Sequence, residues 1–284
     1  MKKTLKRWLQ DKIGIGENRD KLVLLEKRIA ALATLAQWGL PEVLPIPKNI
    51  MASAWEEMIR TRGPEWAQVP QGIHRSDPMF RYPFQVHGGD TLSVLHEYYQ
   101  TGIAAAQTLQ SISSGPQRIL DFGGGYGRVG RFLGAAYPEA TRMVSDPKPS
   151  AVAFQIKHFG ALADDQQSVD LIFAGSVFTH LAKETFISTL HALLGRLSRQ
   201  GKLVLTLHAF DSADFVFHPY TEESALKELE DVLSENAYGS VYCSEAFFTH
   251  SLESDPNTAN TWRYEVLQNN LFGGTQLYVA VSRA

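Results

Sequence analysis

Apolar residues in the first part of the chain recur at helical spacing. Intervals of three and four residues continue over about two heptads, which is the pattern of an amphipathic or coiled-coil helix. The seam is short, so two interpretations stay open: the helix packs on its own domain, or it contacts a second copy of the chain and forms a homodimer. The positions are Leu22, Leu25, Ile29, Leu32 and Ala36.

From residue 118 onward, short apolar runs alternate with helical segments. This alternation predicts a Rossmann-like, doubly wound and mostly parallel α/β sheet. The connection at Gly273 and Gly274 is too short for a parallel crossover, so the C-terminal strand is expected to be antiparallel. Strands are expected over 118–122, 141–145, 169–173, 201–208, 262–268 and 275–283, and helices over 128–136, 149–158, 183–197 and 221–233.

The residues that precede this alternation predict a helical N-terminal extension. Helical spacing is present over 52–60 and 92–111, whereas 62–89 is rich in Pro, Gly, His and aromatic residues. We therefore expect two domains. Residues 1–90 would form a helical leader and substrate-side cap, and residues 91–284 would form the α/β domain.

Composition and charge narrow the class of partner. The 284 residues include 27 Lys and Arg against 30 Asp and Glu, a formal net charge of −3, so no basic surplus favours nucleic acid. Cys243 is the only cysteine; a disulfide framework and a thiolate metal cluster within one chain are excluded, and a cytoplasmic location is expected. No apolar run approaches the ~20 residues of a transmembrane helix. Basic residues such as Lys2, Lys3 and Arg7 would give weak peripheral contact with an anionic membrane.

A glycine-rich run follows the first expected strand. It reads Asp121-Phe122-Gly123-Gly124-Gly125-Tyr126-Gly127-Arg128. A strand that ends in such a loop and turns into a helix brings backbone close to a ligand at the carboxyl edge of the sheet. The run fits G-x-G-x-x-G of dinucleotide sites, with Asp146 about 20 residues further on, and it also fits D-x-G-x-G-x-G. A carboxylate at the strand tip repels a pyrophosphate and attracts a cationic ligand, which favours the second interpretation.

This region resembles the class I S-adenosylmethionine-dependent methyltransferases. The matching segments are 118–133 (RILDFGGGYGRVGRFL), 143–152 (MVSDPKPSAV) and 168–181 (SVDLIFAGSVFTHL), and the similarity extends over residues 90–284. The resemblance implies S-adenosyl-L-methionine as the cofactor and a methyltransferase domain over 91–284. The Gly-Gly-Tyr-Gly-Arg run is similar to methyltransferases proposed to act on sugars, which suggests a role in polysaccharide or natural-product biosynthesis.

The resemblance also implies roles for single residues. Gly123, Gly125 and Gly127 would enclose the methionine part of the cofactor, Asp121 would hold its ammonium directly or through water, and Asp146 would accept both ribose hydroxyls. Residues 158–168 leave room for only a very short third strand, so the acid at the adenine amino group stays open between Asp164 and Asp165. The expected cofactor-binding set is Asp121, Phe122, Gly123, Gly124, Gly125, Gly127, Arg128, Asp146, Pro147, Asp164, Gly175, Ser176 and Val177.

Two histidines are candidates for acid–base chemistry. A sulfonium methyl is already activated, so positioning supplies much of the catalysis, but a hydroxyl acceptor must still lose its proton to a base. His180 follows the fourth expected strand and His208 closes the fifth; His180 is the preferred candidate, and a structural hydrogen bond is the alternative role for each. Three residues before the first expected strand have two possible roles: they form a cap over the acceptor, or they pack within an amphipathic helix. These residues are His87, Tyr98 and Tyr99.

These observations predict an O-methyltransferase acting on a small molecule or a saccharide. Amino-directed nucleic-acid methyltransferases carry [Asn/Asp]-Pro-Pro-aromatic after the fourth strand, where this chain has Ala174-Gly175-Ser176-Val177. The carboxylates that metal-dependent catechol-type enzymes need at that strand end are missing, so no metal is expected. An N-methyltransferase for a small amine or amino sugar, an NAD-dependent oxidoreductase and a non-catalytic scaffold stay open as alternatives.

Overall fold

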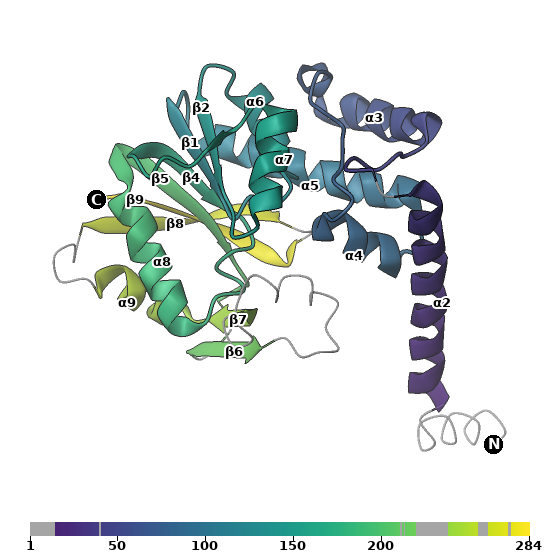
Figure 1. Ribbon diagram of the computed structural model, residues 1–284. Helices are drawn as coiled ribbons and strands as arrows, with labels where there is room; N and C mark the ends of the chain where they lie inside the picture. The colour runs from purple at the N-terminus through teal and green to yellow at the C-terminus, as the bar shows by residue number, and fades with distance from the viewer. Residues whose placement is uncertain are drawn as a thin grey trace. The chain divides into compact units, whose positions relative to one another are not determined.

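The structure, a computed structural model, describes residues 15–39, 41–210, 212, 214–219, 238–254, 261–271 and 274–284. The basic N-terminal residues and the helix expected over 221–233 lie outside this part of the chain. The chain divides into two compact units (Figure 1). One consists of Met1–Glu57 and Ile73–Tyr98, and the other of Met58–Gly72 and Tyr99–Ala284. None of the described helices is both long and apolar enough to cross a membrane.

Helices make up most of the regular structure before residue 113, as the sequence predicted. They are α2 (Ile15–Trp38), α3 (Lys48–Arg62), the 3-10 helix η1 (Pro64–Trp66), α4 (Pro78–Val86) and α5 (Thr91–Ile112). Asp77 is the N-cap of α4. Its side chain accepts a hydrogen bond from the Met79 N–H at 2.9 Å, which satisfies one of the otherwise unpaired N–H groups at the start of the helix.

Helix α2 packs on α4 through a face that the heptad pattern did not single out. Ala31 on this face is fully buried, and the rings of Trp38 and Phe84 lie 5.4 Å apart. The predicted seam is left exposed: Leu22, Leu25, Ile29 and Leu32 are 48–58% exposed. The helix therefore packs on its own unit, as one of the two interpretations expected, but not through the predicted seam; contact of the seam with a second copy stays a prediction.

A seven-stranded sheet forms the larger unit and confirms the predicted fold class. Its order is β3-β2-β1-β4-β5-β9-β8. The strands β1 to β5 pair in parallel, and β9 lies antiparallel between β5 and β8. The third strand is confirmed as very short, because it has two residues. The bounds are β1 Arg118–Phe122, β2 Thr141–Ser145, β3 Leu162–Ala163, β4 Val169–Ala174, β5 Leu197–Leu207, β8 Trp262–Leu271 and β9 Gln276–Arg283.

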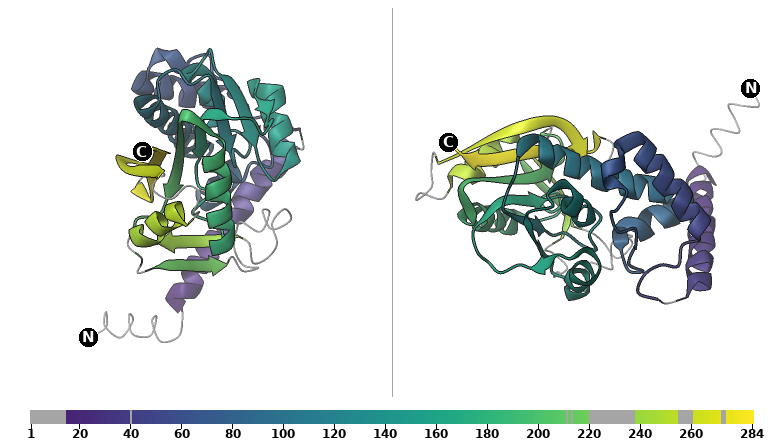
Figure 2. Two further views of the ribbon diagram at one scale, coloured as in Figure 1. Left: turned by 90° about the vertical axis from the view of Figure 1, so that its left-hand side faces the viewer. Right: turned by 90° about the horizontal axis from the view of Figure 1, so that it is seen from above.

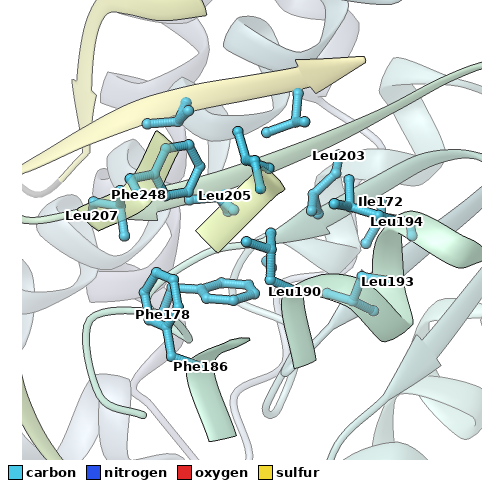
Figure 3. Close-up of a cluster of buried hydrophobic side chains, with 14 of the residues drawn as sticks. Ile172, Phe178, Phe186, Leu190, Leu193, Leu194, Leu203, Leu205, Leu207 and Phe248 are labelled. Carbon is cyan, nitrogen blue, oxygen red and sulfur yellow. The ribbon is translucent and has the colours of Figure 1, made fainter. Parts of the chain in front are cut away.

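Helices cover both faces of this sheet (Figures 1 and 2). The connecting helices are α6 (Gly130–Ala136), α7 (Pro149–Phe159) and α8 (Lys183–Gly195), and α9 (Glu245–Glu253) follows later in the chain. On one face, leucines and phenylalanines of α8 and α9 pack on Ile172, Leu203 and Leu205 (Figure 3). On the other face, residues of α5 and α6 pack on Ile119, Leu171 and Val204. Successive strand residues thus alternate between two apolar layers, as expected for a doubly covered sheet.

Residues 58–72 belong to the larger unit although they lie far from it in the sequence. The Trp66 ring is buried and meets the Phe132 ring of α6 edge-on at 5.9 Å. Arg131, also buried, donates from Nη1 to the carbonyl of Gly72 at 2.9 Å and to that of Pro70 at 3.2 Å, and its Nε donates to the carbonyl of Gly127 at 2.9 Å. One guanidinium therefore joins this segment to the glycine loop.

A second, two-stranded sheet was not predicted from the sequence. It pairs β6 (Phe215–Pro219) with β7 (Gly239–Cys243) in antiparallel fashion. The backbone of β7 also bonds the segment that follows β4, because the N–H of Gly239 donates to the His180 carbonyl at 3.0 Å and that of Val241 to the Thr179 carbonyl at 2.8 Å. The small sheet is thereby attached beside the carboxyl ends of β4 and β5.

Candidate functional site

The glycine loop and the segment after β4 lie next to each other at the carboxyl edge of the sheet. β1 and β4 are parallel neighbours, so the residues that follow them emerge on the same edge. A Cβ built on Gly123 would lie 2.4 Å from Cγ2 of Val177, and Gly123 has a φ of 67°. Both the contact and the backbone conformation require glycine here. The structure thus brings together two of the segments that the sequence assigned to one site.

Asp146 fixes the shape of the glycine loop. One carboxylate oxygen accepts from the Gly125 N–H at 2.8 Å, and the other accepts from the Lys148 N–H at 2.8 Å. Gly123 adds a backbone bond from its N–H to the Ser145 carbonyl at 2.7 Å. Each carboxylate oxygen has a second lone pair, so Asp146 retains acceptor capacity for a hydroxyl pair of a ligand. Burial raises the pKa of this carboxyl, and its two backbone hydrogen bonds oppose the shift.

Gln155 of α7 bonds to the backbone of the same loop and was not predicted from the sequence. Its Nε2 donates to the carbonyls of Gly124 and Gly125 at 3.1 and 2.9 Å, and the residue is buried. A signal was present, because this glutamine lies on the helix face that also carries Ala151, Phe154 and Phe159. A polar residue within an apolar stripe needs a buried partner, and here that partner is the loop backbone.

Asp121 is a buried carboxylate with an unsatisfied oxygen. Its side chain lies against Gly124 and Gly130, and Oδ2 is buried without a hydrogen-bond partner. Burial raises the pKa of Asp121 to about 7; the charge of Asp146 raises it further, and a hydrogen bond from Gln155 opposes this. A cationic ligand above the loop, bound directly or through water, would stabilise the ionised form of this carboxyl. The residues therefore fit a ligand with an ammonium group.

A hydrogen-bonded group of three side chains shapes the segment after β4. The Ser176 N–H donates to Thr206 Oγ1 at 2.7 Å, and both hydroxyls donate to Gln276 Oε1, from Ser176 at 2.9 Å and from Thr206 at 2.7 Å. Ser176 has a φ of 58°, a left-handed conformation that is uncommon for serine. The three hydrogen bonds hold Ser176 in this conformation, directly before Val177. Thr206 and Gln276 were not predicted, and no local sequence signal marks them.

Both candidate histidines reach this edge and bond to β7. His180 Nδ1 lies 2.7 Å from the Gly239 carbonyl, and His208 Nδ1 lies 2.6 Å from the Val241 carbonyl. Burial lowers the pKa of His180 to about 4, the bond to Gly239 opposes the shift, and the charge of His208 lowers it further. His180 is therefore neutral at pH 7.

Asp164, one of the two acids considered for the adenine amino group, is paired with an arginine. Its carboxylate oxygens accept from the two Nη atoms of Arg196 at 2.6 and 2.7 Å, and Asp165 pairs with Arg118 at 2.6 Å. Arg118 begins β1 and Arg196 immediately precedes β5, while the Asp164 N–H donates to the Val144 carbonyl of β2 at 3.1 Å. These pairings give no support to Asp164 as the residue that contacts the adenine.

The other residues expected at the site have contacts of their own. Tyr98 is buried and donates to Asp77 Oδ2 at 2.6 Å, and Tyr99 is buried and donates to the Gln71 carbonyl at 2.6 Å. These contacts agree with packing and not with a cap over an acceptor. His87 ends α4 and lies 3.5 Å from a carboxylate oxygen of Glu97. Burial raises the pKa of Tyr278 in β9, and a hydrogen bond with Thr108 and the charge of Arg128 oppose this shift.

The remaining expected residues flank the loop. Phe122 packs on the apolar layer of α8 and α9, and Pro147 is exposed between Asp146 and Lys148. The Phe173 ring lies against Gly175, where a Cβ would come within 2.5 Å of it. Within the described ranges, no group of three or more His, Cys, Asp or Glu side chains is arranged to hold a metal ion.

Comparisons with known proteins give distant likenesses. No protein-family model and no curated protein matches the chain. Among solved structures it is similar to the mitomycin 7-O-methyltransferase MmcR, with 17% identity and a TM-score of 0.47 over 82% of this chain and 67% of that one. It is similar to DhpI in complex with SAH, with 14% identity and a TM-score of 0.45 over 84% and 99%. It is also similar to the glycopeptide N-methyltransferase MtfA complexed with S-adenosyl-L-methionine, with 13% identity and a TM-score of 0.44 over 65% and 94%.

Proposed function

We propose that the protein is an S-adenosylmethionine-dependent methyltransferase. The observation that carries this proposal is the glycine loop after β1 with its two carboxylates, Asp121 buried beneath it and Asp146 bonded to the Gly125 N–H. A pyrophosphate would meet both negative charges, whereas an ammonium group and a ribose diol would be attracted by them. The order of the sheet places this loop at its carboxyl edge, where open α/β sheets bind their ligands.

Residues of this chain would bind and orient the cofactor. Gly123, Gly125 and Gly127 give a loop without Cβ atoms over which the methionine part would lie, Asp121 would balance its ammonium, and Asp146 would accept the ribose hydroxyls. Gly175, Ser176 and Val177 would lie beside the sulfur, and Phe122, Gly124 and Pro147 would complete the surroundings. When bound, S-adenosyl-L-methionine supplies a methyl group activated by its sulfonium.

The acceptor atom in this proposal is a hydroxyl oxygen of a small molecule or saccharide. A hydroxyl must lose its proton, and His180 and His208 are the imidazoles at the edge where the acceptor would bind. A small amine or amino sugar is the alternative acceptor, since a neutral amine attacks without prior loss of a proton. We place the enzyme in the cytoplasm, in polysaccharide or natural-product biosynthesis, with residues 1–90 as leader and acceptor-side cap.

A thermal-shift comparison tests the cofactor. S-adenosylhomocysteine should raise the melting temperature of the protein, whereas NADH at the same concentration should leave it unchanged. The Asp146→Ala variant is the matched control, and it should lose most of the shift. Stabilisation by NADH without stabilisation by S-adenosylhomocysteine would replace the methyltransferase proposal with that of an oxidoreductase. Absence of both shifts would favour a scaffold without a cofactor.

A screen with labelled methyl donor tests the acceptor. Candidate saccharides, phenols and amines are incubated with the protein, and the labelled product is analysed by mass spectrometry to locate the methyl group. Transfer to oxygen supports the O-methyltransferase proposal, and transfer to nitrogen supports the alternative. The Asp121→Asn, Asp146→Ala double variant serves as the control for transfer that does not depend on the cofactor site.

The homodimer through α2 is tested by light scattering. Four of its five seam residues are 48–58% exposed, and a contact between two copies would remove them from water. Ile29→Glu should convert a dimer to a monomer, whereas Ile156→Glu, on the exposed side of α7, should leave the mass unchanged. A wild-type protein that is monomeric at high micromolar concentration would contradict the homodimer.

A further inference from the structure

Strand β7 holds both histidines in the same way. The carbonyls of Gly239 and Val241 bond to the Nδ1 atoms of His180 and His208 at 2.7 and 2.6 Å. Carbonyls two residues apart in a strand point to the same side, so one edge of β7 serves both imidazoles. These contacts are long-range, since 59 and 33 residues separate the partners.

Tyrosines of the same segment stack on the same two rings. The Tyr238 ring lies 4.7 Å from the His180 ring at an interplanar angle of 25°, and the Tyr242 ring lies 4.6 Å from the His208 ring at 20°. Residues four apart in a strand lie on one face. Each imidazole is thus held by a hydrogen bond to a carbonyl and by a tyrosine ring stacked on its face. Both contacts come from residues 238–242.

The bonds to carbonyls determine where the proton lies on each ring. A carbonyl oxygen can only accept, so Nδ1 must carry the proton that is donated to it. A neutral imidazole has one N–H, and its other nitrogen then carries a lone pair. In the neutral state, both histidines have the proton on Nδ1 and the lone pair on Nε2.

We propose that residues 238–242 position the two acid–base histidines. They hold both as Nδ1–H tautomers, so that Nε2 is the atom that takes the proton from the hydroxyl of the methyl acceptor. This inference rests on the proposed function for the use of the proton but not for the tautomers. Gly239 and Val241 act through their carbonyls, and Tyr238 and Tyr242 act through their rings. The proton of the acceptor hydroxyl moves to Nε2 and later leaves to solvent.

Nitrogen-15 NMR of the full-length protein tests the tautomers without cofactor or acceptor. The chain has nine histidines, so His180→Gln and His208→Gln variants assign the two signals. We expect a protonated Nδ1 and an unprotonated Nε2 for both residues at pH 8. A protonated Nε2 on either ring would overturn the proposal.

Variants of the tyrosines test the positioning. Tyr242→Leu removes one stack and should give His208 a mixture of tautomers, whereas Tyr242→Phe keeps the ring and should give the wild-type spectrum. Tyr238→Leu and Tyr238→Phe should do the same for His180. If both leucine variants keep the wild-type tautomers, the tyrosines have no positioning role and the proposal is overturned.

The same samples separate this proposal from the proposed function. Binding of S-adenosylhomocysteine is measured by calorimetry in each variant, and the leucine variants should bind it with wild-type affinity because Asp121 and Asp146 are unchanged in them. Retained binding also shows that a variant is folded. Correct tautomers without any binding of S-adenosylhomocysteine would overturn the methyltransferase and leave the positioning of the histidines intact.

Discussion

The two halves of the candidate site use opposite chemistry on the same edge of the sheet. Over β1 and β2, backbone N–H groups donate to a carboxylate, and a second carboxylate is buried with an unsatisfied oxygen. Over β4 and β5, imidazole N–H groups donate to backbone carbonyls of β7. The first half can receive positive charge and hydroxyl groups, and the second presents imidazole rings. A cationic cofactor at the first half and an acceptor that loses a proton at the second would match this division.

The largest expected effect lies in the imidazole half. His180→Gln and His208→Gln should each be tested, and removal of the residue that acts as base should lower the rate of methyl transfer by about 10²-fold or more. The affinity for S-adenosylhomocysteine should stay unchanged in both, since neither ring belongs to the carboxylate half. Single-turnover kinetics with the acceptor found in the labelled-methyl screen measure the rate. Near-normal turnover in both variants would remove the histidines from acid–base chemistry.

A substitution in the carboxylate half should weaken the binding of the cofactor. Asp146→Ala removes the acceptor of the Gly125 and Lys148 N–H groups and of the expected ribose hydroxyls. S-adenosylhomocysteine should bind more weakly by about 1–3 kcal/mol, because charge-assisted hydrogen bonds are lost. Calorimetry measures this, and Glu139→Ala, which removes an exposed carboxylate between α6 and β2, is the control. Equal affinity in the two variants would contradict the role of Asp146.

A pair of glycine substitutions compares two positions within the loop. Gly123→Ala and Gly125→Ala both place a Cβ on a left-handed backbone, which costs on the order of 1 kcal/mol each. A Cβ at position 123 would also lie 2.4 Å from Val177, whereas none of the atoms around position 125 comes within 4 Å. Urea unfolding should therefore show Gly123→Ala as the less stable variant. The reverse order would mean that the loop does not touch the segment after β4.

The smallest expected effect is a dependence of cofactor binding on pH. The pKa of Asp121 is raised to about 7, chiefly by burial, so this carboxyl becomes protonated and neutral as the pH falls through 7. S-adenosylhomocysteine keeps its ammonium over this range, and its affinity should fall a few-fold between pH 8 and pH 6. Asp121→Asn should abolish the dependence. Calorimetry at several pH values measures it, and a steeper dependence in the variant would exclude Asp121 as the titrating group.

The same pKa predicts the sign of a stability change. The folded protein holds the Asp121 proton more tightly than the unfolded chain does, so the contribution of this group to stability is full below pH 3.8 and is lost as the pH rises through about 7. Relative to wild type, Asp121→Asn should therefore gain stability at pH 8 compared with pH 6 when no cofactor is present.

The sequence predicted the carboxylate half well because its parts are local. The strand, the glycine loop and Asp146 lie within about 30 residues, and their spacing matches a known ligand-binding pattern. Gln155 was missed although it interrupts an apolar helix face. The helix after β4 ends earlier than expected and β5 begins at Leu197, because the polar run 198–202 hides the first half of that strand.

The imidazole half could be predicted only in part. His208 directly follows β5, and His180 lies in the turn segment after β4, and so both were found. Their partners in β7 and the Gln276 that holds Ser176 come from segments 33 to 100 residues away, and such pairing leaves no local pattern. The strands β6 and β7 are short and lack clear alternation, so they were not predicted. The burial of Tyr98 and Tyr99 and the hydrogen bonds of their hydroxyls depend on tertiary contacts, which helical spacing in the sequence does not determine.

Arg131 has a consequence for any shortened form of the protein. A chain that starts at residue 91, at the predicted domain boundary, would lack Pro70, Gly72 and Trp66. The guanidinium would lose two of its carbonyl partners while it stays close to the Phe159 ring, 4.6 Å from the ring centroid. A buried charge without its partners is strongly destabilising. Expression of the α/β domain alone should therefore retain residues 58–72, supplied as a separate peptide or through a linker, to give a soluble product.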